Sequence, residues 1–366
     1  MKLLTSAAVS LLLISLAGVS YSQISQTERE ALIALFNATG GYNWSINNGW
    51  NGAAGTECDW YGVGCSYGSV SRIVLDDNSL SGSIPAELGN LTNLTSLYLN
   101  VNSLTGSIPS ELGNLTNLVF LSLNNNSLSG SIPTELGNLT KVTVLYLGNN
   151  SLTGSIPAEL GNLTNVTDLS LNFNSLTGNV PSELGNLTNL TSLDISINSL
   201  SGSIPAELGN LTNLTGLSLA YNSLTGSIPA ELGNLTNLTS LSFNNNSLSG
   251  GIPAELGNLT NLTYLFLDNN SLTGSIPSQL GNLTNLSGFS LGDNFLTGPL
   301  PQWLSDMAIP YLNVTDAFNE WPSPYNGVTP DSSFNLEFNN IGTFNSSDST
   351  IYTCLRVFTD GLPGSV

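Results

Sequence analysis

The sequence has no histidine among its 366 residues, and its five lysine and arginine residues face 25 aspartate and glutamate residues. Without histidine, the usual general base and every Ser/His or Cys/His nucleophile pair are excluded. Zinc sites built from histidine are excluded as well. A formal net charge of −20 also argues against a phosphate-binding surface. We therefore expect no enzyme, no cofactor, no metal site and no nucleic-acid partner.

Long apolar runs are also scarce, and the one that exists stands at the start of the chain. Residues 1–22 combine Lys2, an apolar stretch and small residues before Ser22–Gln23, the layout of a cleaved secretory signal peptide. An uncleaved membrane anchor is the alternative, although the run is short for a membrane span. The prediction is a secreted or cell-surface (extracellular) protein without a transmembrane span in the mature chain.

Cysteine is limited to Cys58, Cys65 and Cys354. In an oxidising compartment the first two can pair and close the loop CDWYGVGC. Cys354 is then left free, bonded to another chain, or separated from a partner beyond the end of the sequence. The last possibility would make the carboxyl-terminal region the start of a truncated domain.

Against these absences stands a repeat of 24 residues. A proline recurs without insertion, at Pro85, Pro109, Pro133, Pro157, Pro181, Pro205, Pro229, Pro253, Pro277 and Pro301. In LTSLYLNVN, Leu97 and Leu99 alternate with polar residues, as in a strand with one buried face. No single repeat can bury its leucines alone, so stacked coils are expected.

Two further columns of the repeat have predicted structural roles. An asparagine recurs at Asn102 and its equivalents, where an amide can satisfy backbone groups as the chain turns inward. The segment SIPAELGN predicts one helical turn that begins at Pro85, carries Glu87 in its first turn and stops at Gly89. The glutamates would form a solvated row, and a cation-binding row is the alternative.

The pattern LxxLxLxxNxLxGxIP resembles the plant-type leucine-rich repeat over about residues 70–304. The resemblance implies a right-handed α/β solenoid, with a parallel sheet on a concave face and short helical turns on a convex face. The predicted boundaries are a signal peptide (1–22), an amino-terminal cap (23–69), about ten repeats with a degraded last coil (70–320), and a carboxyl-terminal β-rich region (321–366).

The amino-terminal cap also resembles that of plant-type repeat proteins. TEREALIALFNAT predicts a helix with an apolar face. Trp44, Trp50 and Trp60 are expected to pack on this helix and over the first coil, and an aromatic ligand cage is the other interpretation.

The outward positions of the strands vary most between repeats, and aromatic and acidic residues there predict a ligand-binding face. The alternative is an unselected surface of recently duplicated repeats. The candidate residues are Tyr98, Phe120, Tyr146, Asp168, Phe173, Asp194, Tyr221, Tyr264, Phe266 and Asp268. Asp168 and Asp194 are diagonal neighbours at about the carboxylate spacing of inverting glycosidases, but nothing nearby in the sequence would raise one pKa.

The resemblance implies binding of a protein, peptide or glycan on the concave face, without chemistry. The family includes plant receptor-kinase ectodomains and polygalacturonase inhibitors, so inhibition of a secreted hydrolase is one alternative. A structural surface or ice-binding protein is another, because threonines recur beside the strands and could order water. They stand at Thr95, Thr143, Thr167, Thr191, Thr215, Thr239 and Thr263. Oligomeric state is left open.

Overall fold

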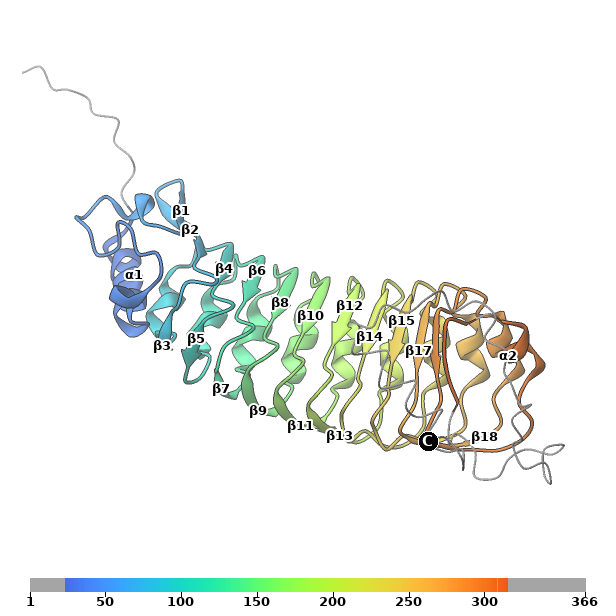
Figure 1. Cartoon of the computed structure of the whole chain (residues 1–366). Coiled ribbons are helices and arrows are strands. Elements are labelled where there is room, and N and C mark those ends of the chain that lie inside the picture. Colours follow the sequence, from blue (N-terminus) through green and yellow to red (C-terminus); the bar gives the residue numbers. More distant parts are fainter. Residues whose placement is uncertain (1–23, 308, 315–366) are drawn as a thin grey trace, which may run out of the picture.

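The protein is an elongated stack of coils, seen in a computed structural model that describes residues 24–307 and 309–314 (Figure 1). Helix α1 (Gln26–Ala38) lies at one end and helix α2 (Gln302–Asp306) at the other. The solenoid predicted from the repeat is confirmed. The predicted signal peptide, Cys354 and the carboxyl-terminal region 321–366 lie outside the described residues.

One sheet of 12 strands runs the length of the stack, with each strand next to the strand of the following coil. Its first pair, β1 and β2, is antiparallel, and the others are parallel. The strands are β1 (Val63–Ser66), β2 (Ser69–Val74), β4 (Ser96–Tyr98), β6 (Phe120–Ser122), β8 (Val144–Tyr146), β10 (Asp168–Ser170), β12 (Ser192–Asp194), β14 (Gly216–Ser218), β15 (Ser240–Ser242), β17 (Tyr264–Phe266), β19 (Gly288–Ser290) and β21 (Tyr311–Asn313).

The register of this sheet places the same repeat position of every coil side by side. Leu97 is paired with Ile73 on one side and Leu121 on the other, and all three side chains are fully buried. The core is therefore a continuous column of leucines and isoleucines shared between neighbouring coils. Burial of this apolar surface is the main favourable term in folding.

Shorter sheets follow the turn of each coil. Serine and threonine occupy most of their outward positions. The strands are β3 (Ser81–Ser83) with β5 (Ser103–Thr105), then β7 (Ser129–Ser131), β9 (Ser151–Ser155), β11 (Ser175–Asn179) and β13 (Ser199–Ser201), and finally β16 (Ser249–Gly250), β18 (Ser271–Gly274) and β20 (Phe295–Leu296).

Each coil closes with a five-residue 3-10 helix that begins after the repeated proline. These are η3 (Ala86–Asn90), η4 (Ser110–Asn114), η5 (Thr134–Asn138), η6 (Ala158–Asn162), η7 (Ser182–Asn186), η8 (Ala206–Asn210), η9 (Ala230–Asn234), η10 (Ala254–Asn258) and η11 (Ser278–Asn282). The helical turn was predicted correctly, but the role given to Gly89 was wrong. Gly89 lies inside η3, buried, where a Cβ would collide with the backbone oxygen of Glu111 in the next coil.

The asparagine column performs the predicted backbone role. Asn102 accepts hydrogen bonds from the amides of Asn78 and Leu80 and donates to the carbonyls of Leu75 and Leu99. Since the two carbonyls belong to consecutive coils, each amide joins its own coil to the preceding one. This arrangement satisfies buried backbone groups where the chain leaves the sheet.

The amino-terminal cap covers the first coil with α1 and the 3-10 helices η1 (Gly41–Asn43) and η2 (Glu57–Asp59). Ser25 and Glu28 form a capping box, which satisfies free amides at the start of α1. Phe36 is buried against Trp44 and Trp50, with ring centroids 5.3 and 6.1 Å away. The three tryptophans pack as predicted, and each indole N–H is bonded inside the protein.

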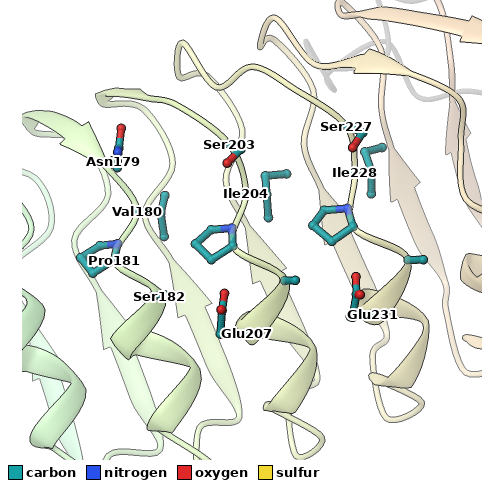
Figure 2. Close-up of a pocket in the computed structure, with 14 residues that line it drawn as sticks. Asn179, Val180, Pro181, Ser182, Ser203, Ile204, Glu207, Ser227, Ile228 and Glu231 are labelled. Atoms are coloured by element: carbon teal, nitrogen blue, oxygen red, sulfur yellow. The ribbon is translucent and has the colours of Figure 1, made fainter.

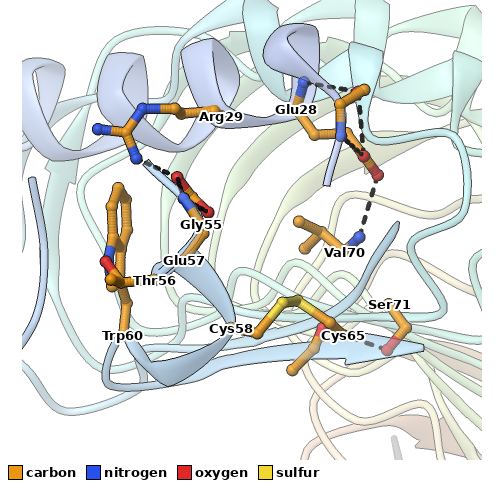
Figure 3. The surroundings of a disulfide bond; sticks show 12 residues. Glu28, Arg29, Gly55, Thr56, Glu57, Cys58, Trp60, Cys65, Val70 and Ser71 are labelled. Carbon is orange, nitrogen blue, oxygen red and sulfur yellow. Dashed lines mark hydrogen bonds and ion pairs between the residues drawn. A yellow bond between two sulfur atoms is a disulfide. The ribbon is translucent and has the colours of Figure 1, made fainter. Parts of the chain in front are cut away.

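A disulfide and a buried ion pair hold the loop of the cap (Figure 3). Cys58 and Cys65, the pair that the sequence allows, form a disulfide here. Arg29 forms an ion pair with Glu57 and lies over the ring of Trp60, 5.4 Å from its centroid. Glu28 accepts a hydrogen bond from the amide of Val70 at 3.0 Å, which ties α1 to the first parallel strand.

The last described coil is one residue shorter than the others. Gly288 is paired with Tyr264, 24 positions earlier, but with Tyr311 only 23 positions later. Helix α2 replaces the 3-10 turn there and follows Pro301. The loss of register predicted for the degraded coil is therefore present.

Candidate ligand-binding face

The outward side chains of the 12-stranded sheet, and those that directly follow each strand, form what we call the sheet face. It corresponds to the predicted concave face. Because β-strand side chains alternate, one set of positions fills the core and the other reaches this face. Eight of the ten candidate residues belong to the second set, whereas Phe173 and Tyr221 follow at the bend of the chain after their strands. The candidates form two aromatic groups, a polar hollow with Asp168 beside it, and an apolar row.

The first aromatic group lies near the amino-terminal end of the sheet face. Tyr98 and Phe120 stand on the adjacent strands β4 and β6, and their rings stack with centroids 6.2 Å apart and planes 23° apart. Both side chains are half-buried. Stacked rings of this kind offer a flat apolar area with a hydroxyl at its margin.

The second aromatic group lies at the other end. Tyr264 and Phe266 belong to β17, with centroids 5.9 Å apart, and Phe266 meets Tyr311 edge-on at 5.8 Å. Tyr264 is 45% exposed. Asp268 follows in the same coil and accepts a hydrogen bond from the side chain of Asn269 at 3.1 Å.

A hollow of about 340 Å³ separates the two groups. Its lining residues come from four consecutive coils and are Asn124, Tyr146, Asn149, Ser170, Asn172, Ser192 and Asp194. Five of these were not on the list of candidates. They share repeat columns with the candidates Tyr146, Asp168, Phe173 and Asp268, so the repeat register could have found them.

Electrostatics in the hollow are acidic. Burial raises the pKa of the Tyr146 phenol above its ordinary value of 10.0, and the neighbouring Asp168 carboxylate raises it further. Asp168 accepts a hydrogen bond from the Thr167 hydroxyl at 2.7 Å, and Asp194 accepts from the amide and hydroxyl of Ser196. The ion pair found within the described residues, Arg29–Glu57, lies in the amino-terminal cap and does not involve the carboxylates at the hollow.

Asp168 and Asp194 are indeed diagonal neighbours, because Asp168 is paired with Ser192 and Ser170 with Asp194. Each carboxylate is held by a short-range hydrogen bond to its own coil. The described part of the chain also contains no cluster of three or more His, Cys, Asp or Glu that could hold a metal ion.

An apolar row runs along one edge of the sheet face. We define it as Phe173, Ile197 and Tyr221, which occupy the same position in three consecutive coils, just before the asparagine column. The amide of Asn174 donates to the carbonyl of Ile197, and that of Asn198 to the carbonyl of Tyr221, both at 3.1 Å. Ile197 was missed from the sequence, although it shares the column of the other two.

The recurring threonines beside the strands have a framework role. The Thr143 hydroxyl donates to the carbonyl of Val119, and the Thr191 hydroxyl to that of Thr167, one coil apart each time. The same contact continues through Thr215, Thr239 and Thr263. These hydroxyl protons are therefore used inside the solenoid.

A larger depression of about 840 Å³ lies outside the sheet face, between the turns of three coils (Figure 2). It is lined by equivalent residues of each coil, such as Pro181 and Pro205, Ser203 and Ser227, and Glu207 and Glu231. Most of these framework residues recur in the other coils. The depression offers less distinctive chemistry than the sheet face.

Comparison with known proteins agrees with this architecture. Residues 73–205 match the model of a leucine-rich repeat region, and residues 213–235, 237–259 and 261–283 match the leucine rich repeat. A probable inactive receptor kinase of Arabidopsis thaliana is 38% identical over 95 residues, which are 26% of this chain and 14% of the kinase. The chain thus spans a small part of the curated relatives it matches.

Solved structures extend the comparison to most of the chain. The ectodomain of the Arabidopsis thaliana receptor kinase GASSHO1/SCHENGEN3, in complex with CASPARIAN STRIP INTEGRITY FACTOR 2, is 41% identical with a TM-score of 0.73. The match covers 80% of this chain and 35% of that ectodomain. A plant ice-binding protein is 30% identical with a TM-score of 0.66, over 82% of this chain and 98% of that protein.

The matched residues carry the features that build the coil in this chain: the leucine core, the asparagine column and the turn after the repeated proline. No helix in the described part of the chain has the length and apolar character needed to cross a membrane. The chain belongs to the leucine-rich repeat family, in its plant-type form.

Proposed function

We propose that this chain is a secreted or cell-surface recognition module that binds a protein, peptide or glycan on its sheet face and performs no chemistry there. The observation that carries the proposal is the concentration of aromatic and acidic side chains at outward strand positions. The framework does not need aromatic residues there, since serine fills the same column at Ser122, Ser170 and Ser218.

The relatives support this assignment by analogy. The GASSHO1/SCHENGEN3 ectodomain was crystallised with a factor that it binds, and the plant peptide hormone receptor RGFR1 with RGF2. The first is a leucine-rich repeat ectodomain and the second a peptide hormone receptor, and the structures of both are similar to this chain. The Cys58–Cys65 disulfide is also typical of proteins outside the cytosol.

Peptide and glycan arrays probed with the full chain test the proposal, followed by Tyr98→Ala and Tyr146→Ala. We expect each substitution to weaken binding of the selected ligands, because each removes a ring from the face. Ser96→Ala, on the same strand as Tyr98, is the matched control. Binding that is indifferent to changes across the sheet face would remove the assignment.

A second candidate function is ice binding, favoured by the likeness to the plant ice-binding protein. Here the relevant surface would be the sheet β7–β9–β11–β13. Thr153 and Thr177 are exposed there on adjacent strands, with Thr153 opposite Ser175 and Thr177 opposite Ser155 about 5 Å across the sheet. Thermal hysteresis that is lost in Thr153→Tyr/Thr177→Tyr would support it, and absence of any effect on ice growth would exclude it.

A further inference from the structure

The apolar row of Phe173, Ile197 and Tyr221 stands where the backbone favours other residues. At this position the chain enters the left-handed region, with φ values of 51°, 54° and 54° for the three residues. Asparagine tolerates that conformation, whereas a β-branched residue such as isoleucine adopts it rarely. Four equivalent positions of the same column are in fact asparagine: Asn125, Asn149, Asn245 and Asn269.

The row is also exposed, so packing does not explain it. Phe173 is 47% and Tyr221 53% exposed, and Ile197 between them is partly exposed. Consecutive coils place the three side chains about 5 Å apart in one line. Three adjacent apolar residues in a conformation that suits asparagine are a backbone outlier from which function can be inferred.

The residues around the apolar row indicate which chemical groups a ligand there would carry. Asn149, the residue of this column one coil before Phe173, lines the same hollow as Asp194. Asp168 lies in the coil of Phe173, and Asp194 in the coil of Ile197. A ligand on the row therefore meets carboxylates at its margin, and the whole chain carries a net charge of −20.

From this arrangement we infer that the row and the hollow bind one extended peptide segment that combines a large apolar side chain with lysine or arginine. The apolar side chain packs on Phe173, Ile197 and Tyr221, and the cation lies toward Asp168 and Asp194. The inference rests on the proposed function and specifies its ligand. A second copy of this chain does not fit, because it would bring like charges together.

The test is a display library of random peptides of about 12 residues, long enough in extended form to cross the row and the hollow. The library is first depleted on the variant Phe173→Asn/Ile197→Asn/Tyr221→Asn and then selected on the wild-type chain. We expect surviving peptides to be basic, to contain a large apolar residue, and to bind the wild type at least about tenfold more tightly than the variant.

The triple variant is chosen because asparagine occupies the equivalent positions of four other coils. The midpoint of its thermal unfolding should not fall below that of the wild type. A loss of binding would then result from the changed surface and not from unfolding. Asp168→Asn/Asp194→Asn should weaken the same peptides, and the weakening should diminish at high salt. Glu207→Gln/Glu231→Gln removes the same charge from the turns and should leave the affinity unchanged.

Two results would overturn the inference: no peptide survives depletion, or the survivors are neutral or acidic and ignore Asp168→Asn/Asp194→Asn. The proposed function fails separately. If peptides selected without depletion lose affinity in Tyr98→Ala or Tyr146→Ala but not in the triple variant, the sheet face binds ligands and the inference alone is wrong. If no sheet-face variant matters, both are wrong.

Discussion

At the scale of the residue, the ionisation of Tyr146 is sensitive to the environment of the hollow. Its pKa is raised, first by burial and then by Asp168. The phenol therefore stays protonated above pH 10, where an unfolded tyrosine ionises. Its contribution to stability is complete below about pH 10 and is lost as the pH rises through the raised pKa.

Asp168→Asn should consequently lower the pKa of Tyr146, but not to its ordinary value, because burial is the larger cause. Phenolate absorbance followed during alkaline titration measures this, with Tyr146→Phe identifying the signal of this residue. An unchanged titration in Asp168→Asn would contradict the proximity of the two groups. Asp268→Asn, on the same face but remote from Tyr146, should leave the titration as it is.

Asn270 gives a residue-scale prediction for the framework. It accepts from the Leu248 amide at 2.9 Å and donates to the carbonyls of Phe243 and Leu267 at 3.0 and 3.1 Å, and it is only 7% exposed. Asn270→Ala leaves these groups buried without partners, at a cost of about 1–3 kcal/mol in the free energy of unfolding.

Urea unfolding followed by circular dichroism measures the cost. Thr273→Ala changes an exposed side chain three residues later in the same coil and is the control, with an expected change within about 0.5 kcal/mol. Equal stabilities of Asn270→Ala and the control would mean that water replaces the amide, and that the asparagine column does not hold the coils together.

At the scale of the element, the turns after the repeated proline pack more closely than their sequence indicates. Gly161 lies buried in η6, and an added Cβ would stand 2.5 Å from the backbone oxygen of Glu183 in η7. Gly161→Ala must push the two turns apart and should destabilise the chain by about 1–3 kcal/mol. Gly216 on β14 has nothing within 4 Å of the same added atom.

Gly216→Ala is therefore the matched control, and it should be neutral or stabilising by up to about 1 kcal/mol, because it restricts the unfolded chain. Thermal unfolding of the two variants under one condition gives the comparison. If both substitutions had the same effect, close approach of neighbouring turns would not explain the repeated glycine.

The elements also show how far the sequence alone could lead. Leu97 and Leu99 alternate with polar residues, and this pattern fixes both the strand and its buried side. The register then follows from the unbroken period, so Asn102 could be assigned its backbone role. Gly89 was misjudged because glycine after a helical turn usually marks its end, and only the neighbouring coil reveals the contact with Glu111.

The candidate site was less predictable for a different reason. The outward columns could be read from the repeat, and Tyr98, Phe120, Tyr264 and Phe266 do form pairs of rings. Which columns lie together depends on how the chain bends after each strand. The repeat register already lines up Ile197 with Phe173 and Tyr221, whereas the bend that brings Asn149 into the hollow, and its left-handed backbone, are visible only in the structure.

At the scale of the whole molecule, the core is a continuous column in which each coil contacts chiefly its neighbours. A whole coil can therefore be removed without changing the register of the others. Deletion of residues 187–210 joins Asn186 to Leu211, and deletion of residues 235–258 joins Asn234 to Leu259. Each pair of joined residues repeats the junction of an intact coil, which runs from asparagine to leucine.

Both shortened chains should fold, with a denaturant slope reduced by about one tenth, because unfolding exposes about one tenth less surface. Their binding should differ. The first deletion removes Asp194 and Ile197, whereas the second removes none of the candidate residues, so only the first should release the peptides selected on the wild-type chain. Fluorescence anisotropy at equal protein concentration makes the comparison. Equal affinity of the two shortened chains would show that binding follows the length and charge of the solenoid and not the apolar row.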